Sequence, residues 1–304
     1  MNKQNSARLS SRDNQNKALL ALLFGAIGIS LSPIFVRLSE VEPTVSAFYR
    51  TGLAVPMLLL WPFLLPARKQ SVTLGPHGRQ LGYLFVLAGL FFAFDLIFWH
   101  RSIALTSVAN ATLFPNFAPV IVTIVAWFLF GEKITRGFVL GLSIAVIGAI
   151  IIVGDSFGRG GSNFRGDMMG LATAFFYAGY LIVVSRLRRA ASVQQIMLWS
   201  SVISALILLA FALFSGDNLA PASLYSWLVL LALAGVSQVG GQGMIAYALA
   251  HLPVSFSSVG LLIQPALAAL FGYLILSEPI GAWQGAGVMI ILVGIYLARR
   301  GSDH

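Results

Sequence analysis

The sequence predicts an all-α integral membrane protein with ten transmembrane helices, arranged as two inverted repeats of five helices each. The first observation is composition: 58% of the 304 residues are hydrophobic and only 10% are charged, whereas soluble domains have about 25% charged residues. The second is a series of apolar segments, each long enough to cross a bilayer. The third is a sequence pattern that occurs twice, 146 residues apart.

Ten apolar segments meet the length of roughly 17–25 residues that a membrane-spanning helix requires. The first follows a polar, basic stretch at residues 1–17 that has no A-x-A-like cleavage site. We therefore expect a cytoplasmic tail followed by a retained helix, rather than a signal peptide that is removed. Short connections with turn-forming residues join the segments. The expected spans are 18–38, 43–65, 80–104, 107–130, 135–154, 167–187, 193–214, 223–249, 253–277 and 281–298.

The distribution of lysine and arginine predicts the orientation of these spans. Of the 19 basic residues, 14 fall on the side of the N-terminus, four fall on the other side, and Arg50 lies within the membrane. Because cytoplasmic loops carry an excess of basic residues, both termini are expected in the cytoplasm. The same excess accounts for the net charge of +9 without a nucleic-acid partner.

An internal repeat organises the chain around the Gly-rich polar stretch GDSFGRGGSNFRGD. Shifting one half by 146 residues aligns Pro119 with Pro265 and Glu132 with Glu278. Since each half has an odd number of spans, the second half must be inverted in the membrane relative to the first. Inverted repeats recur in secondary transporters, with the site near the bilayer midplane between them. The expected units are the tail 1–17, a first repeat 18–154, a periplasmic linker 155–166 and a second repeat 167–300.

The two copies of the repeated pattern read APVIVTIVAWFLFGEKI and QPALAALFGYLILSEPI, and a Gly-rich apolar segment follows each copy. The second span reads PTVSAFYRTGLAVPML. From Lys17 to Arg300 the chain resembles the EamA-type families of the drug/metabolite transporter (DMT) superfamily. The resemblance implies ten helices, cytoplasmic termini in a bacterial inner membrane, and transport without ATP. It also implies a central cavity lined mostly by helices one, three, four, six, eight and nine, but it implies no particular substrate.

Two ionisable residues inside the expected spans are functional candidates, because charges are costly in a bilayer. Arg50 lies some seven residues into the second span, and Asp95 lies nine residues before the outer end of the third. At 1.5 Å per residue, both reach depths of about 10 to 13 Å, so an ion pair between them is expected. The pair is either a structural link between helices or a site that holds a zwitterionic substrate or changes protonation during transport.

Polar side chains recur at helical spacing on several spans, where lipid cannot satisfy their hydrogen bonds. Helix-to-helix hydrogen bonds explain any one stripe, but the stripes fall on helices that line the family's cavity, which favours a shared polar pocket. His100 is either a proton carrier, because imidazole titrates near neutral pH, or a hydrogen-bonded residue near a helix end. The candidates for substrate binding are Asp95, Trp99, Thr112, Asn116, Tyr177, Tyr180, Gln238, Gln242 and Gln264.

Three prolines inside the spans, Pro33, Pro119 and Pro265, each remove an intrahelical hydrogen bond. They produce either static kinks or hinges for alternating access, and the repeated pair favours hinges. Glu132 and Glu278 end their spans on opposite membrane faces, each just before the next helix. A carboxylate there can face the positive N-terminus of that helix, so we expect both glutamates to be structural corner residues rather than proton carriers.

These observations predict a secondary transporter, a permease that exports an amino acid or a similar small amphipathic metabolite by alternating access. The alternative is a transporter or flippase of another substrate class on the same fold, such as a sugar, nucleotide sugar, drug or lipid-linked sugar. Motifs of hydrolases and of Walker-type phosphate loops are absent, so an enzyme is not expected. With four histidines and no cysteine, we expect no metal site and no cofactor. The expected partners are a small-molecule substrate and the lipid bilayer, without nucleic acid, and the protein is expected to be a monomer or homodimer.

Overall fold

The computed structural model describes residues 3–64, 78–105, 114–157, 164–277 and 282–302. Within these ranges the chain forms helices and their connections, without a β-strand. The helices of the first half are α1 (Lys3–Ser30), α2 (Ser32–Leu38), α3 (Pro43–Gly52), α4 (Ala54–Leu64), α5 (Gly78–Leu105), η1 (Phe114–Phe117), α7 (Ala118–Phe130) and α8 (Arg136–Phe157).

The second half continues in the same way, and local signals set several of its boundaries. Ser192 and Gln195 form a reciprocal capping box before α10: each side chain accepts a hydrogen bond from the backbone N–H of the other, at 3.2 and 3.1 Å. The helices are α9 (Phe164–Leu187), α10 (Val193–Ser215), α11 (Leu224–Ala232), η2 (Leu233–Gln242), α12 (Gly243–Ala248), α13 (Val254–Gly260), η3 (Leu261–Ile263), α14 (Gln264–Leu276) and α15 (Ala282–Ser302).

Seven helical segments of the described chain are long and apolar enough to cross a membrane. Two further apolar segments, Phe114–Phe130 and Arg136–Ile151, have fewer than 18 residues. The second expected span is divided into α3 and α4, which have 10 and 11 residues. The chain is therefore a multi-pass membrane protein, while the count of ten spans stays a prediction.

The local structure of α7 recurs in α14, 146 residues later. Each helix has 13 residues, follows a short 3-10 turn, and has a proline in its first turn. Each is followed by a residue in the left-handed region, Gly131 with φ 63° and Ser277 with φ 57°. The repeated sequence pattern is thus accompanied by a repeat of local structure.

Several of the expected spans are interrupted near their middle. Leu31 separates α1 from α2, Leu53 separates α3 from α4, and the π-helix η2 separates α11 from α12. Pro33 lies in the first turn of α2, after the break at Leu31. Pro119 and Pro265 lie in the first turns of α7 and α14, which follow the 3-10 turns η1 and η3. In a first turn the missing N–H of proline costs no hydrogen bond. The prolines therefore begin helices rather than kink continuous ones, and their role as hinges stays a prediction.

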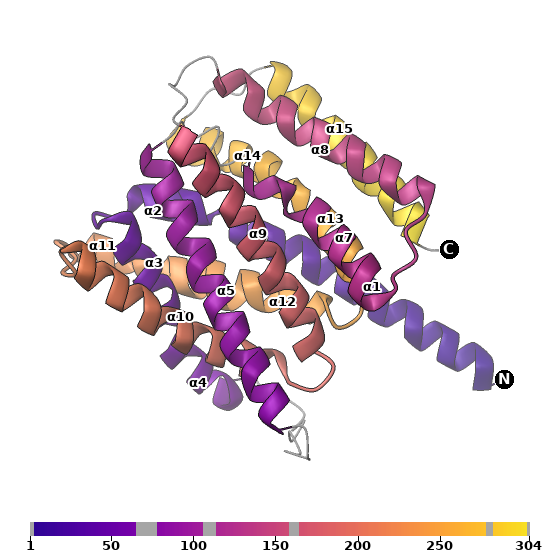
Figure 1. The fold of residues 1–304 in the computed structure, drawn as a ribbon, viewed down its shortest axis with the longest axis horizontal. Coiled ribbons are helices and arrows are strands. Elements are labelled where there is room, and N and C mark those ends of the chain that lie inside the picture. The colour runs from indigo at the N-terminus through magenta and orange to yellow at the C-terminus, as the bar shows by residue number, and fades with distance from the viewer. Residues whose placement is uncertain (1–2, 65–77, 106–113, 158–163, 278–281, 303–304) are drawn as a thin grey trace.

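Helices α8 and α15 pack along each other at one edge of the molecule (Figure 1). Glycines make the contact close: a Cβ added at Gly141 would lie 2.2 Å from the backbone nitrogen of Ala298. A Cβ added at Gly294 would lie 2.4 Å from the nitrogen of Ala145. Small residues at such positions let two membrane helices approach, which maximises their van der Waals contact.

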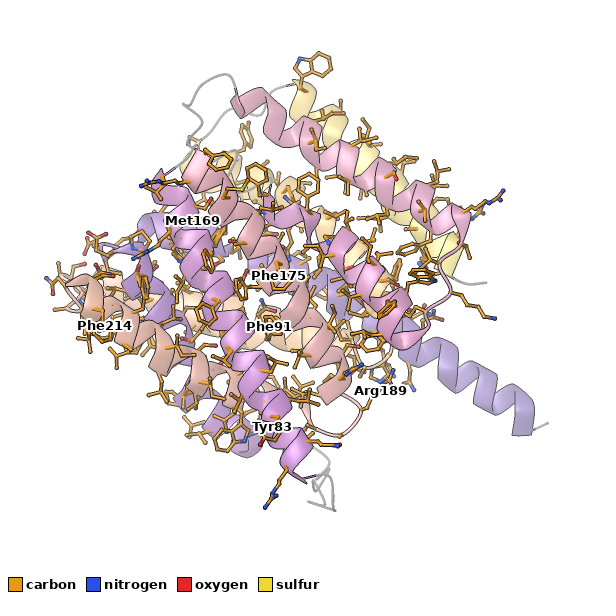
Figure 2. All side chains as sticks on the ribbon, in the orientation of Figure 1. Tyr83, Phe91, Met169, Phe175, Arg189 and Phe214 are labelled. Carbon is orange, nitrogen blue, oxygen red and sulfur yellow. The ribbon has the colours of Figure 1, made fainter. Side chains whose placement is uncertain are left out.

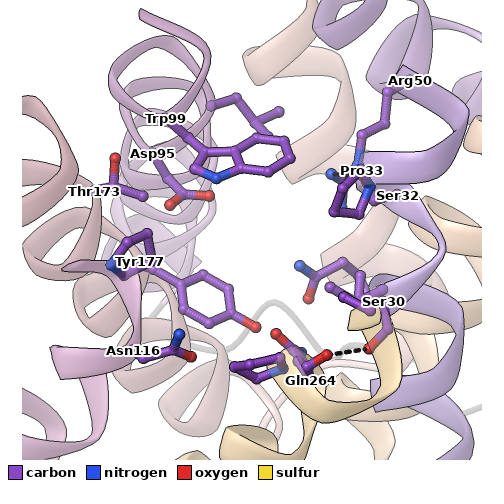
Figure 3. Close-up of a pocket in the computed structure, with 16 residues that line it drawn as sticks. Ser30, Ser32, Pro33, Arg50, Asp95, Trp99, Asn116, Thr173, Tyr177 and Gln264 are labelled. Carbon is purple, nitrogen blue, oxygen red and sulfur yellow. Dashed lines mark hydrogen bonds between the residues drawn. The ribbon is translucent and has the colours of Figure 1, made fainter. Parts of the chain in front are cut away.

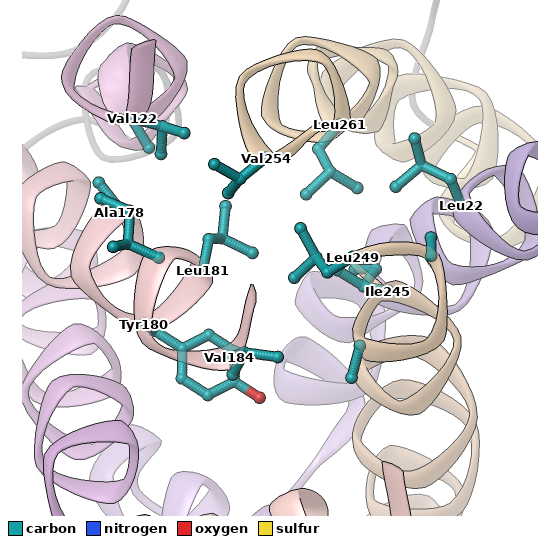
Figure 4. Packing of buried hydrophobic residues seen from close by; sticks show 14 of the residues in the cluster. Leu22, Val122, Ala178, Tyr180, Leu181, Val184, Ile245, Leu249, Val254 and Leu261 are labelled. Carbon is teal, nitrogen blue, oxygen red and sulfur yellow. The ribbon is translucent and has the colours of Figure 1, made fainter. Parts of the chain in front are cut away.

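Apolar side chains fill the centre of the molecule and also cover its outside. In the core, Leu22, Val122, Leu181 and Leu261 come from both halves of the chain (Figure 4). On the outside, large apolar side chains project away from the helices (Figure 2), and Phe214 is 92% exposed. An apolar outer surface of this extent matches a bilayer, where lipid replaces water around the protein.

We predict that Gly141→Ala lowers the midpoint of thermal unfolding in detergent, because its methyl group overlaps the backbone of α15. Overpacking of this kind typically costs about 1–3 kcal/mol. Gly137→Ala is the matched control, since the nearest atom to its Cβ is Gly301 Cα at 3.6 Å. Equal midpoints for the two variants would contradict the close packing of α8 on α15.

Candidate functional site

A cavity of about 120 Å3 lies where the interrupted helices meet. Its wall contains residues of α1, α2, α3, α5, η1, α9, η2 and α14 (Figure 3). Breaks in these helices bring the ends of α2, α14 and η2 to the cavity, which is where irregular backbone is tolerated in membrane proteins. The residues on its wall that were singled out from the sequence are Pro33, Arg50, Asp95, Trp99, Asn116, Tyr177, Gln242, Gln264 and Pro265.

Arg50 is the cation of this cavity, and neutral groups hold it. Its side chain is only 4% exposed. The Nε–H donates to Oε1 of Gln238 at 3.1 Å, and Nη1 donates to the hydroxyl of Ser32 at 2.9 Å. The guanidinium carbon lies 5.5 Å from the centre of the Phe92 ring, within the range of a cation–π contact. These contacts fix the position of the charge without neutralising it.

Asp95 and Trp99 form the facing wall, one turn apart on α5. The Asp95 side chain is 7% exposed. Figure 3 shows Asp95 and Arg50 on opposite sides of the cavity. No direct ion pair joins the two residues in the described part of the chain, and the hydrogen bonds of Arg50 go to Ser32 and Gln238. The two residues therefore line the same cavity, as expected, but they do not contact each other.

Uncharged polar groups line another part of the cavity. Tyr177 and Asn116 approach Gln264 there (Figure 3). The backbone carbonyl of Gln264 accepts a hydrogen bond from the Ser30 hydroxyl at 3.2 Å, which ties α14 to the end of α1. Gln242 at the end of η2 completes this group.

Two of the proposed substrate contacts lie outside the cavity wall. The Tyr180 side chain is 1% exposed, its ring lies 4.8 Å from that of Phe92, and its hydroxyl faces the sulfur of Met197 at 3.8 Å. Gln238 is fully buried, and its amide is used by Arg50 and by Ser201, to which it donates at 3.3 Å. Gln238 therefore positions the arginine rather than lining the cavity.

His100 is buried at 2% exposure and is also not on the wall. Its Nδ1 lies 2.6 Å from the carbonyl oxygen of Leu96, which can only accept, so Nδ1 carries the hydrogen and donates a hydrogen bond to that carbonyl. Its ring makes an edge contact with Trp99, with centroids 4.9 Å apart. His100 thus supports the tryptophan of the wall from behind.

Glu132 caps a helix, but not the one that the sequence suggested. Its carboxylate accepts hydrogen bonds from the backbone N–H of Val254, at 3.2 Å, and from the hydroxyl of Ser255. Both belong to the first turn of α13. The start of α8 has its own cap, because the Thr135 hydroxyl accepts from the N–H of Phe138 at 3.1 Å. Thr112 and Glu278 lie outside the described residues.

Three uncharged polar residues of the wall were not among the candidates for substrate binding, namely Ser30, Ser32 and Thr173, although Thr173 belongs to the polar stripe of its span. The two serines flank the break at Leu31, in a first span that looks uniformly apolar. The signal that could have identified them is the sequence SLSP, in which polar residues precede a proline inside a span. Thr173 lies one turn before Tyr177 on α9, at the i, i+4 spacing of a shared face.

An outer surface that suits lipid and a cavity with charged and polar side chains between the helices are together typical of a membrane transporter. The EamA-like transporter family matches the chain twice, over residues 16–154 and again over 164–300. The chain therefore belongs to the EamA-like transporter family.

Named relatives are transporters as well. The chain is 27% identical to the pseudopaline exporter of Pseudomonas aeruginosa (strain UCBPP-PA14) over 286 residues, covering 92% of this chain and 95% of that protein. It is 24% identical to a "probable amino-acid metabolite efflux pump" of Escherichia coli (strain K12) over 295 residues, covering 93% and 95%. A crystal structure with 18% sequence identity matches with a TM-score of 0.76, covering 94% of this chain and 98% of its own, which supports the fold.

We predict that Glu132→Ala lowers the midpoint of thermal unfolding, because it leaves the first turn of α13 without its acceptor. The loss of such a cap typically costs about 0.5–2 kcal/mol. The exposed neighbour Lys133 provides the control variant, Lys133→Ala. A double-mutant cycle with Ser255→Ala should show coupling between the two residues; strictly additive effects would contradict the contact.

Proposed function

We propose that this transporter moves a zwitterionic small metabolite, of which α-amino acids are the simplest class, out of the bacterial cell by alternating access. The observation that carries the proposal is the opposed placement of Arg50 and Asp95 across one cavity. A single ligand with both a carboxylate and an ammonium group complements both walls.

The geometry around Arg50 supports this assignment. Gln238 and Ser32 engage Nε and Nη1, so the donors of Nη2 are available to a carboxylate. An arginine–carboxylate contact is a strong, charge-assisted interaction. On the facing wall Asp95 can accept from an ammonium group, and Trp99 beside it offers a ring face for a cation or an apolar body. Charges this deep in a membrane protein are costly, and a functional role explains why they are there.

The proposed mechanism rests on the two halves of the chain forming ten spans as inverted repeats. The family matches each half separately, and α7 and α14 share length, proline position and terminal geometry. Under this proposal the breaks before Pro33, Pro119 and Pro265 act as hinges at which the halves rock around the cavity. Both termini are then cytoplasmic, as the distribution of basic residues predicts.

Export is the proposed direction because of the relatives. The names of two proteins that align over more than nine-tenths of this chain describe an exporter and an efflux pump. The second name refers to amino-acid metabolites. Amino acids are zwitterions, and a cavity with one basic and one acidic residue suits a ligand of that class.

We predict that Arg50→Gln and Asp95→Asn each lower amino-acid counterflow in proteoliposomes by at least about tenfold, since each leaves one ligand charge unpaired. Folded yield and elution volume on gel filtration should stay near those of the unmodified protein. Arg101→Gln is the control, because Arg101 is exposed and lies over the Phe211 ring at 4.4 Å. Loss of yield with unchanged flux per folded molecule would assign the two residues a structural role instead.

The proposed topology has a direct test, because the chain contains no cysteine. We predict that, in spheroplasts, a membrane-impermeant maleimide labels Asn218→Cys but labels Lys133→Cys only after the membrane is permeabilised. Both positions are exposed and lie in connections between helices. The reverse pattern would contradict the cytoplasmic location of the termini, and labelling of both positions in sealed spheroplasts would contradict the ten-span inverted arrangement.

A further inference from the structure

The charged and the uncharged groups of the cavity occupy different parts of its wall. Among the described residues on the wall, the charged ones are Arg50 and Asp95. Figure 3 shows them at one end of the cavity, with Tyr177, Asn116 and Gln264 toward the other. A ligand held by its charged groups at the first end must therefore place the rest of its structure among neutral polar groups.

Three polar atoms at the neutral end are buried and have no hydrogen-bond partner: the Tyr177 hydroxyl, Oε1 of Gln242 and Nε2 of Gln264. The hydroxyl lies close to the side-chain amides of Gln242 and Gln264 and points toward Gln264 in Figure 3, yet none of the three atoms reaches hydrogen-bond geometry. The Gln242 side chain is only 2% exposed. Buried polar groups without partners are rare, and three together at one cavity require an explanation.

We infer that these three residues form a second subsite, which binds an uncharged side-chain group that both donates and accepts hydrogen bonds. A primary carboxamide fits: its NH2 group donates to Oε1 of Gln242, and its carbonyl accepts from Nε2 of Gln264 and from the Tyr177 hydroxyl. The inference rests on the proposed function, because the Arg50–Asp95 end must hold the α-carboxylate and the α-ammonium group for the side chain to reach this subsite.

The same atoms discriminate against other side chains. An apolar side chain of equal length leaves all three polar groups buried and unpaired, and a site built to form hydrogen bonds rejects such a ligand strongly. A side-chain carboxylate would bring a third charge to a region where the described wall offers no cation, so its desolvation is uncompensated. The subsite therefore selects for a neutral polar side chain over both alternatives.

Competition in proteoliposomes tests this with three ligands of similar length. The full-length protein exchanges radiolabelled glutamine against unlabelled glutamine, methionine or glutamate. We expect half-maximal inhibition by glutamine at a concentration at least about tenfold below that of the other two. This comparison uses the unmodified protein, so it does not depend on any variant folding.

A matched pair of variants assigns the effect to the subsite. Tyr177→Phe removes one hydroxyl from the cavity, and it should weaken glutamine about three- to tenfold while leaving methionine unchanged. Tyr180→Phe removes the same group one turn further along α9, outside the wall, and should leave the preference of the unmodified protein intact. Gln242→Leu is a second variant, which should reduce the preference in the same direction.

The outcomes separate the subsite from the proposed function. Exchange of glutamine and methionine with equal affinity would overturn the subsite and leave the zwitterion transporter in place. An equal effect of Tyr177→Phe and Tyr180→Phe on glutamine would overturn it as well. Failure of every amino acid to exchange would overturn the proposed function, and the subsite with it.

Discussion

The Arg50 guanidinium is a buried cation held by neutral groups, and the rest of the cavity is arranged around it. Ser32 and Gln238 satisfy two of its nitrogens, but hydroxyl and amide oxygens do not cancel its charge. Asp95, the acidic residue of the cavity, lies on the facing wall instead of closing on the arginine. A direct pair would lower the cost of both charges. Keeping them apart leaves that stabilisation to a ligand that carries both complementary charges, and this is our reason for assigning a zwitterion to the cavity.

Breaks in the helices are what allow this arrangement. Ser32 is the first residue of α2, directly after the interruption at Leu31, and Gln238 lies in the π-helix η2. The two groups that hold Arg50 therefore lie in or next to departures from regular α-helix. Irregular backbone leaves hydrogen-bonding groups without helical partners, and it is tolerated in a membrane protein where it faces a polar cavity rather than lipid. The tightly packed pair α8 and α15 lies at the edge of the molecule, and none of the described residues on the wall belongs to it.

Hydropathy is sufficient to predict where long helices lie, because burial in lipid imposes length and composition directly. The expected segment 80–104 corresponds to α5 (Gly78–Leu105), whereas Pro119 and Pro265, which were expected inside continuous spans, lie in the first turns of new helices. The lateral arrangement was harder to predict. Sequence position predicts the depth of a residue in the membrane but not its direction around the helix. The similar depths of Arg50 and Asp95 therefore suggested a contact, whereas in the structure the two side chains lie on opposite walls of the cavity. Tyr180 is rotated by about 60° from Tyr177 at 100° per residue, enough to place it against Phe92 instead of the cavity.

The central claim is that one ligand must supply both a negative and a positive charge to this cavity. Counterflow by the unmodified protein in proteoliposomes tests it most directly, with three forms of the amino acid that exchanges fastest. These are the zwitterion, the amine that lacks its carboxylate, and the N-acetyl derivative that lacks its positive charge. We predict that both single-charge forms compete at least about tenfold more weakly than the zwitterion. Equal competition by either form would contradict the joint role of Arg50 and Asp95.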